Sequence, residues 1–345
     1  MPDAHLVGHP PPLSEIGWDA RRRDEIAVLG AGLRPGRCVR VDGSSALALT
    51  ARGIERVRAR EPIATGDWLA VGAPWARRME RRTEIARRAP GGRAGARQVL
   101  AANVDLLVAV CGLDRPLRIG RVQRSIALAR GGGADAHVVL TKADLHADPE
   151  AVAAGLSASV GVGVGVVSAV TGSGVAPLAA LAAPGLTVAL IGESGAGKTT
   201  LVNALVGARR AVGEVRGGDA KGRHTTTARE LVPLPGGGAL IDTPGLREVG
   251  VADAAGVEAA FGEITAIAEA CRFGDCRHDG EPGCAVRAAA EAGLLDPEDV
   301  ARMVAMRREA EAAELRADEH ARRRHERGFA KVVREAKRHK RGRRR

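Results

Sequence analysis

The sequence predicts a mixed α/β fold in which a parallel-sheet core lies between a small N-terminal β-barrel and a helical C-terminal part. Three observations predict this fold. Short strand-like runs lie between 36 and 88, apolar runs alternate with helical stretches from 99 to 250, and three cysteines lie within 14 residues after position 270. We therefore divide the chain into a lead-in, a barrel, a core, a helical domain and a basic tail, at 1–35, 36–90, 91–250, 251–320 and 321–345.

Length and composition exclude several classes of protein. A chain of 345 residues has room for two or three domains with a proper core. No window approaches the roughly 18 unbroken apolar residues of a membrane span, and Asp3 with the prolines at 10–12 does not fit a signal peptide. We therefore expect a cytoplasmic protein without a membrane partner. The five cysteines do not make a secreted disulfide framework, and Cys38 and Cys111 are expected to be small core residues.

The net charge of the chain lies at its C-terminal end. Residues 321–345 contain 13 Lys and Arg against 2 Asp and Glu, which accounts for the whole net charge of +11, because the remaining 39 basic and 39 acidic residues balance. Such an arm fits a nucleic acid, since each neutralised phosphate releases counterions; a solvated chain end is the alternative. Tyr is absent and the Phe and Trp residues are scattered, so we expect RNA contacts mainly to backbone and shape.

The N-terminal part predicts a loose lead-in with one short helix, followed by a barrel. Five short runs with turn signals between them predict the barrel strands: GRCVRVDG, ALALT, GIERVRA, GDWLAVG and RRTEIARR. They fit an oligonucleotide-binding (OB) barrel, and an SH3-like barrel would leave a similar pattern. The segment PGGRAGARQ at 90–98 has the composition of a linker.

Apolar periodicity predicts the strands and helices of the core and of the C-terminal part. Strands are predicted at 104–110, 136–140, 164–168, 186–191 and 238–241, and a helix at 118–133 ends on glycines. This alternation implies a mainly parallel sheet with helices on both faces. Beyond the core, Val257, Phe261, Ile264 and Ile267 recur near helical spacing and predict one amphipathic helix. A final helix is predicted by Asp296 as N-cap and Pro297 as its first residue.

A phosphate-binding loop is predicted by GESGAGKTT, which follows the strand LTVALI and precedes a helical run. Its glycines let the backbone N-H groups point at phosphates, and the helix N-terminus adds positive charge. Lys198 should reach the β and γ phosphates, and the Thr199 hydroxyl should bind Mg²⁺. The expected nucleotide contacts are Gly192, Glu193, Ser194, Gly195, Ala196, Gly197, Lys198, Thr199 and Thr200. The loop alone leaves a kinase, an ATPase and a GTPase open, and a chance match is the alternative.

Two further motifs, each at a strand end, indicate a guanine nucleotide. In TKAD, which includes Thr141, the Asp144 carboxylate would accept two hydrogen bonds from guanine, and the stem of Lys142 would cover the base. In SAVTG, which begins at Ser168, the backbone N-H of Ala169 would reach the guanine oxygen. Each motif is weak alone, but together with the phosphate loop they favour GTP and GDP as ligands.

A third motif, DTPG at 242–245, would serve hydrolysis. Asp242 would meet Mg²⁺ through water, and the Gly245 N-H would sense the γ-phosphate. Leu246 follows where many GTPases carry the glutamine that orients the attacking water. An apolar side chain cannot do this, so the intrinsic rate should be low unless another group or a partner supplies the contact.

A metal site is predicted by four residues with the spacing C-x4-C-x-H-x5-C: Cys271, Cys276, His278 and Cys284. Three thiolates and an imidazole make a closed tetrahedral zinc site without an open position for substrate, so one structural Zn²⁺ per chain is expected. Buried unpaired cysteines are the alternative, although polar and turn residues surround the cluster.

The order of these motifs predicts a circularly permuted P-loop GTPase core, because TKAD and SAVTG precede the phosphate loop and DTPG ends the core. In this order the chain resembles the ribosome small subunit-dependent GTPase A family (RsgA, also called YjeQ). The resemblance rests on RPGRCVRVDG, TGDWLAV, AANVDLLVAV, VVLTKADL, GRHTTTARELVPLPGGGALIDTPGLRE and CRFGDCRHDGEPGCAV. The chain departs from the family in GESGAGKTT, where GxSGVGKS is usual, and in its longer, more basic tail.

The resemblance implies a GTPase that binds the small ribosomal subunit and its rRNA late in assembly, with hydrolysis stimulated by the subunit, and a monomer is expected. It also implies that His224 orients the attacking water, beside Lys198 and Gly245 as catalytic groups; an exposed loop residue is the alternative. One of Thr225, Thr226 and Thr227 should be the switch threonine. We expect Thr226 to be a magnesium ligand together with Thr199 and Asp242.

Two other functional classes remain open. A nucleotide-gated RNA-binding scaffold with negligible turnover is compatible with Leu246, and ribosome-stimulated hydrolysis distinguishes it from a GTPase. An ATP-using kinase is opposed by Asp144, and nucleotide competition would decide. In the leading hypothesis GTP orders the switches and fixes the barrel and the zinc domain on RNA, and hydrolysis releases them.

Overall fold

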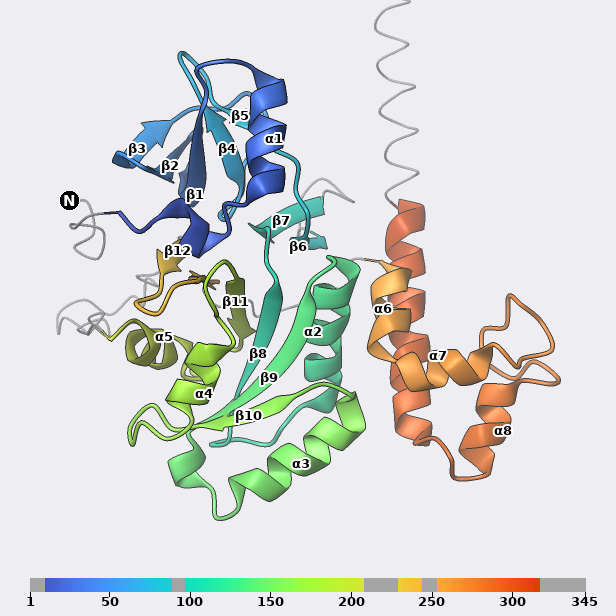
Figure 1. Cartoon of the computed structure of the whole chain (residues 1–345). Helices are drawn as coiled ribbons and strands as arrows, with labels where there is room; N and C mark the ends of the chain where they lie inside the picture. Colours follow the sequence, from blue (N-terminus) through green and yellow to red (C-terminus); the bar gives the residue numbers. More distant parts are fainter. Residues whose placement is uncertain (1–9, 89–96, 208–228, 244–252, 317–345) are drawn as a thin grey trace, which may run out of the picture.

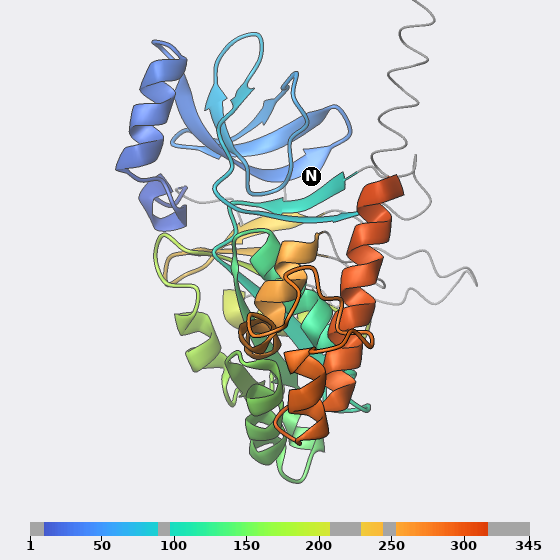
Figure 2. The same cartoon turned by 90° about the vertical axis from the view of Figure 1, so that its right-hand side faces the viewer.

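The computed structural model describes residues 10–88, 97–207, 229–243 and 253–316 of the chain. A β-barrel, a six-stranded α/β core and a helical C-terminal part follow one another along the sequence (Figure 1). The helical part lies along one side of the core, and the barrel lies at one end of it (Figure 2). None of the described helices is long and apolar enough to span a membrane.

The barrel begins after a 3-10 helix (Leu13–Ile16) and helix α1 (Ala20–Leu29), where one short helix was predicted. Its sheet has the order β3-β2-β1-β4-β5, with bounds β1 Arg34–Asp42, β2 Ser45–Thr50, β3 Gly53–Val57, β4 Trp68–Val71 and β5 Arg77–Arg78. The two edge strands approach each other at a parallel bridge between Ala59 and Ala76. The sheet therefore closes into the partly open five-stranded barrel that the sequence predicts.

The fifth predicted barrel strand is wrong. The run RRTEIARR forms β6 (Glu84–Arg88), which pairs outside the barrel with β7 (Arg97–Ala102), and the true fifth strand is the two-residue β5. Ile85 of β6 pairs with Ala101 of β7, and it is buried in the same apolar cluster as Leu100 of β7. Residues 97 and 98, which were predicted as linker, belong to β7.

The core sheet has the order β10-β9-β8-β11-β13-β12 and is parallel except for β12, as predicted. Its strands are β8 Leu106–Gly112, β9 Asp135–Thr141, β10 Val164–Val167, β11 Thr187–Gly192, β12 Glu230–Pro233 and β13 Ala239–Asp242. Its helices are α2 Ile119–Gly131, α3 Pro149–Val160, α4 Val175–Ala180 and α5 Lys198–Val206. The predicted strands and the helix at 118–133 are confirmed, and β12 is an edge strand without a predicted counterpart.

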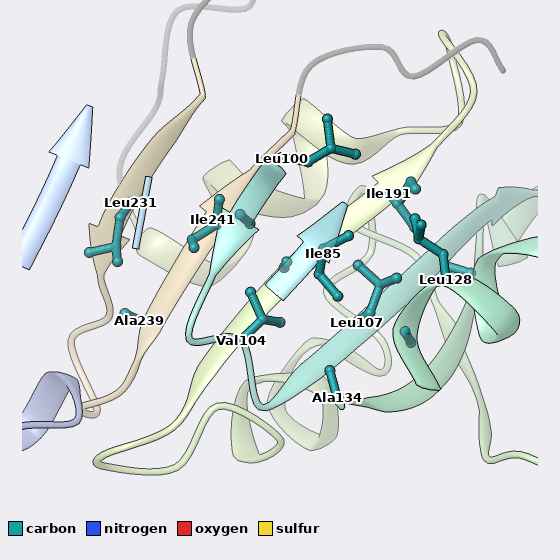
Figure 3. Close-up of a cluster of buried hydrophobic side chains, with 14 of the residues drawn as sticks. Ile85, Leu100, Val104, Leu107, Leu128, Ala134, Ile191, Leu231, Ala239 and Ile241 are labelled. Carbon is teal, nitrogen blue, oxygen red and sulfur yellow. The ribbon is translucent and has the colours of Figure 1, made fainter. Parts of the chain in front are cut away.

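Apolar side chains cover both faces of this sheet. Leu107 of β8 packs in one cluster with residues of α2 and α3, including Leu128 (Figure 3), whereas the next residue, Val108, packs with residues of α4 and α5. Successive residues of a strand point to opposite faces, so β8 contributes to both clusters. Full burial of a side chain such as Leu128 stabilises the fold by about 1.5–3 kcal/mol.

The helical C-terminal part contains α6 (Ala254–Ala260), α7 (Gly262–Ala268), α8 (Ala285–Glu291) and a helix described over 297–316. The single amphipathic helix predicted through Phe261 is wrong, because the backbone of Phe261 leaves the helical region (φ −114°, ψ 47°) and separates α6 from α7. The predicted N-cap is confirmed, since the Asp296 carboxylate accepts the Glu298 N-H at 2.8 Å. A Cβ on Gly256 of α6 would lie 2.4 Å from the Ala127 carbonyl oxygen, so glycine permits the close contact with α2.

A buried arginine joins the barrel to the core. Arg37 of β1 donates to the Thr187 hydroxyl at 2.9 Å and to the Asn103 carbonyl at 3.0 Å, and its guanidinium lies 4.8 Å from the Trp68 ring. Burial lowers the pKa of Arg37 to about 9. Because Thr187 begins β11, the barrel is attached to the strand that carries the phosphate loop.

Candidate nucleotide-binding site and metal centre

The phosphate loop connects the carboxyl end of β11 with the first turn of α5, as its sequence predicts. Gly195 and Gly197 have positive φ angles of 79° and 85°, which glycine adopts without strain. A Cβ on Gly192 would lie 2.4 Å from the Val110 carbonyl oxygen, so a side chain there has no room. The loop therefore requires these glycines, and it ends at a helix N-terminus, which favours an anion.

Lys198 lies at the base of this loop and is only 8% exposed. Its Nζ donates to the carbonyl oxygens of Gly192 at 2.6 Å and Glu193 at 2.8 Å. Burial lowers the pKa of Lys198, and the charge of Asp242 opposes this shift. Asp242 ends β13 and pairs with Leu190 of β11, so the predicted magnesium residue lies on the strand next to the one that leads into the phosphate loop and Lys198.

The other loop residues differ in what they can offer a ligand. Ser194, Gly195, Thr199 and Thr200 are exposed. The Ala196 side chain is buried in the apolar cluster beneath the loop, which leaves its backbone groups for other contacts. The Ala196 carbonyl accepts the buried Thr141 hydroxyl at 2.6 Å. Thr141 thus fixes the end of β9 to the phosphate loop.

The two guanine motifs meet at the carboxyl edge of the sheet, where Thr141 of β9 pairs with Val167 of β10. The buried Ser168 hydroxyl donates to Asp144 Oδ1 at 2.6 Å and also accepts the Thr171 N-H at 3.2 Å. Asp144 itself is exposed, and Ala169 follows Ser168 in the turn. Ser168 therefore holds one carboxylate oxygen of Asp144, which leaves the other for a ligand.

Asp114 and Arg115, in the loop after β8, complete this edge. Neither belongs to the motifs singled out in the sequence. Asp114 accepts from Lys142 Nζ at 2.8 Å and from Arg115 at 3.2 Å. The Lys142 ammonium and then the Arg115 guanidinium lower the pKa of Asp114 to about 2. Glu193 of the loop is paired with Arg115 at 3.7 Å and with Arg121. Their position after a parallel strand was the available signal, since ligands bind beyond the carboxyl ends of such strands.

Several predicted site residues lie outside the described residues. These are His224, Thr225, Thr226, Thr227, Gly245 and Leu246, together with the basic tail at 321–345. Their predicted roles in hydrolysis, magnesium binding and RNA binding stay predictions.

The four predicted metal ligands come together, with one ligand atom from each lying within 4.8 Å of the others. His278 Nδ1 lies 3.7 Å from Cys271 Sγ and 3.5 Å from Cys284 Sγ. Zn-S and Zn-N bonds of about 2.3 and 2.0 Å at a tetrahedral angle require a separation of about 3.5 Å. The donor set and its spacing therefore fit a tetrahedral metal ion.

Local structure holds this cluster in shape. His278 has a positive φ of 62°, which is uncommon for a residue other than glycine. The Glu281 carboxylate accepts the N-H groups of Arg277 at 3.0 Å and Asp279 at 2.8 Å, on either side of His278. The backbone N-H groups of Glu281 itself and of Asp279 lower the pKa of Glu281 to about 2. The turn that carries His278 is thus fixed by its own chain.

Comparisons with known proteins agree with this geometry. A family model described as RsgA GTPase matches residues 78–252. The small ribosomal subunit biogenesis GTPase RsgA of Streptomyces coelicolor is 48% identical over 303 residues, which cover 82% of each chain. The protein of the same name from Opitutus terrae is 41% identical over 337 residues and covers 89% of this chain and 92% of its own. The resemblance seen in the sequence is therefore confirmed.

Two solved structures share the fold. YjeQ from Thermotoga maritima has a TM-score of 0.60 at 22% identity and covers 81% of this chain and 98% of its own. YloQ, described as a circularly permuted GTPase, has a TM-score of 0.59 at 19% identity, covering 82% and 96%. The permutation is also visible here, since β8, β9 and β10 precede the phosphate-loop strand β11. The chain belongs to the RsgA GTPase family and is a circularly permuted GTP hydrolase.

Proposed function

We propose that this GTPase binds the small ribosomal subunit late in its assembly and hydrolyses GTP to GDP and phosphate, faster on the subunit than alone. The observation that carries the proposal is the similarity, over most of the chain, to proteins named small ribosomal subunit biogenesis GTPase. The proposal places the protein in the cytoplasm with its ribosomal partner, and the monomeric state stays a prediction.

The proposed nucleotide site uses the loops at the carboxyl edge of the core sheet. Asp144 recognises guanine with both carboxylate oxygens: Oδ1, which also accepts the Ser168 hydroxyl, accepts N1-H, and the other oxygen accepts the exocyclic amino group, while the N-H of Ala169 contacts the guanine oxygen. Lys198 and the N-H groups of the phosphate loop bind the phosphates. Thr199, Thr226 and, through water, Asp242 would hold Mg²⁺, while His224 and the Gly245 N-H would act on the attacking water and the γ-phosphate.

The proposed rRNA contacts are made by three parts of the chain outside the core. Five arginines of the barrel are exposed: Arg52, Arg56, Arg58, Arg60 and Arg77. A cleft of about 640 Å³ between the barrel edges is lined by Arg34, Arg56 and Arg58. Guanidinium groups suit RNA phosphates, and the Arg60 guanidinium lies 5.7 Å from the centroid of the exposed Trp75 ring. The helical domain with the Cys/His cluster, predicted at 251–320, and the basic tail at 321–345 supply the other two contacts.

Zinc is the proposed metal of the Cys/His cluster, and its role is structural. Three thiolates select a soft or borderline ion, and four protein ligands leave no position for a substrate. When bound, the ion would hold the loop between α7 and α8 in place. Arg307 of the final helix donates to the Cys276 carbonyl at 3.0 Å, so the cluster and this helix are fixed to each other.

The proposal includes a role for the barrel in sensing the nucleotide state. The Thr65 hydroxyl of the barrel donates to the Arg229 carbonyl at 3.2 Å. Arg229 directly follows the segment 208–228, which contains the predicted switch threonines. In the proposal, closure of the switch on GTP acts through this contact on the barrel, and through DTPG on the zinc domain.

Co-sedimentation with purified ribosomal subunits tests the proposal. The full chain is centrifuged with small or large subunits in the presence of GDP or a non-hydrolysable GTP analogue. We expect binding to the small subunit only, and tighter binding with the analogue. Absence of binding would contradict the proposed partner, and equal binding with both nucleotides would contradict the proposed coupling.

A further inference from the structure

We propose that Arg115 is a second cation of the nucleotide site and that its guanidinium binds the phosphate chain of GTP and GDP. The proposal deepens the proposed nucleotide site and rests on it. Arg115 belongs to the loop after β8, the neighbour of β11 in the sheet. The parallel strands β8 and β11 end at the same edge, so this loop and the phosphate loop lie side by side.

The guanidinium of Arg115 lies over the middle of the phosphate loop. Its Nη1 lies 3.5 Å from the Ser194 carbonyl oxygen, and its Nη2 lies 3.2 Å from the point where a Cβ on Gly195 would stand. Lys198 approaches the same loop through the carbonyls of Gly192 and Glu193. The two cations therefore contact successive parts of one loop whose N-H groups are expected to hold the phosphates.

The present partners of Arg115 are loosely held. Its two contacts with Asp114 measure 3.2 and 3.4 Å and its contact with Glu193 measures 3.7 Å, whereas a strong ion pair of this kind measures about 2.7–2.9 Å. The side chain is 41% exposed, and solvent screens such long contacts. A phosphate oxygen on the loop would be a stronger acceptor, because guanidinium and phosphate form charge-assisted, bidentate hydrogen bonds.

Both carboxylates retain another cation when Arg115 changes partner. Asp114 is bound by Lys142 at 2.8 Å, and Glu193 is paired with Arg121. Movement of Arg115 to the nucleotide therefore leaves no carboxylate unpaired. Pro116 follows directly and disfavours the helical region for the Arg115 backbone.

Calorimetric titration of the full chain with Mg-GDP and with a non-hydrolysable GTP analogue tests the proposal. Arg115→Ala should weaken both ligands about tenfold, the loss expected for one partly exposed charge-assisted hydrogen bond. Arg115→Lys should recover part of the affinity, because it keeps the charge. Arg118→Ala is the matched control, since Arg118 is an exposed arginine three residues away in the same loop, and we expect the affinity of the unaltered chain.

A second measurement separates phosphate binding from a structural role. If Arg115 binds phosphate, Arg115→Ala leaves the melting temperature of the nucleotide-free chain unchanged and reduces the gain that GDP produces. Affinity within about twofold of the unaltered chain would overturn the proposal, as would a lower melting temperature of the nucleotide-free chain with unchanged affinity. If the unaltered chain bound neither nucleotide, the proposed nucleotide site would fail, and this proposal with it.

Discussion

Replacement of Asp144 by asparagine should change the base preference of the nucleotide site from guanine to xanthine. The carboxylate accepts hydrogen bonds from guanine N1-H and the exocyclic amino group. Ser168 donates to Oδ1 at 2.6 Å, so an asparagine would keep its oxygen at this hydroxyl and turn its amide nitrogen toward the base. That nitrogen opposes the guanine amino group, a donor, but matches the oxygen that xanthine carries at the same position.

The size of the effect follows from the hydrogen bond that is lost and from the guanine amino group that is left facing a donor. A hydrogen bond to a charged acceptor contributes about 1.5–3 kcal/mol and an unsatisfied donor costs about 1–3 kcal/mol, so the change costs about 3–6 kcal/mol. This corresponds to a GTP affinity lower by roughly two to four orders of magnitude. Xanthosine triphosphate should bind Asp144→Asn more tightly than it binds the unaltered chain.

Competition with a fluorescent nucleotide measures both affinities. Asp148→Asn is the matched control, because Asp148 lies four residues along the chain and its side chain caps α3 at the Ala151 N-H. It should leave the base preference unchanged. A GTP affinity of Asp144→Asn within about threefold of the unaltered chain would refute the assignment of Asp144 to the base.

Three further predictions concern stability and metal content. Thr141→Val leaves the Ala196 carbonyl without its hydroxyl donor and should lower the free energy of unfolding by about 1–3 kcal/mol in denaturant titrations. Arg82 lowers the pKa of Asp19 to about 2, so their ion pair is present above the ordinary Asp pKa near 4 and is lost as the pH falls toward 2. Asp19→Asn should therefore lower the free energy of unfolding by about 0.5–1 kcal/mol at pH 7, and this loss should disappear near pH 2. A loss of stability that does not change with pH would contradict this. Cys284→Ala should lose the bound zinc by elemental analysis and keep GDP affinity; retained zinc would contradict the ligand assignment.

Short contiguous motifs made much of the site predictable from the sequence. The residues from Gly192 to Thr200 follow one another in the chain, so their spacing is the geometry of the loop itself. The metal ligands between Cys271 and Cys284 are equally local, and the structure brings them together. The alternation of apolar runs predicts the parallel sheet because its central strands β8, β11 and β13 are buried on both faces.

Contacts between distant residues could not be predicted in this way. Arg115 lies 79 positions before Ser194, and only the pairing of β8 with β11 brings them together. The strand β5 has two residues and shows no periodicity, so the sequence favours the more regular run at 81–88 as the fifth barrel strand. At Phe261, periodicity continued through a helix break, because the residues on both sides pack in one cluster.

The proposal that this chain is a GTPase stimulated by the small ribosomal subunit is tested by measuring GTP hydrolysis by the full chain with and without purified small subunits. Lys198→Ala serves as the blank, because it removes the cation at the base of the phosphate loop. We expect a slow rate of GTP hydrolysis for the chain alone, a clear increase on addition of small subunits, and loss of that increase in Lys198→Ala. An unchanged rate in a chain that still binds GTP would contradict a ribosome-stimulated GTPase and favour a nucleotide-gated scaffold.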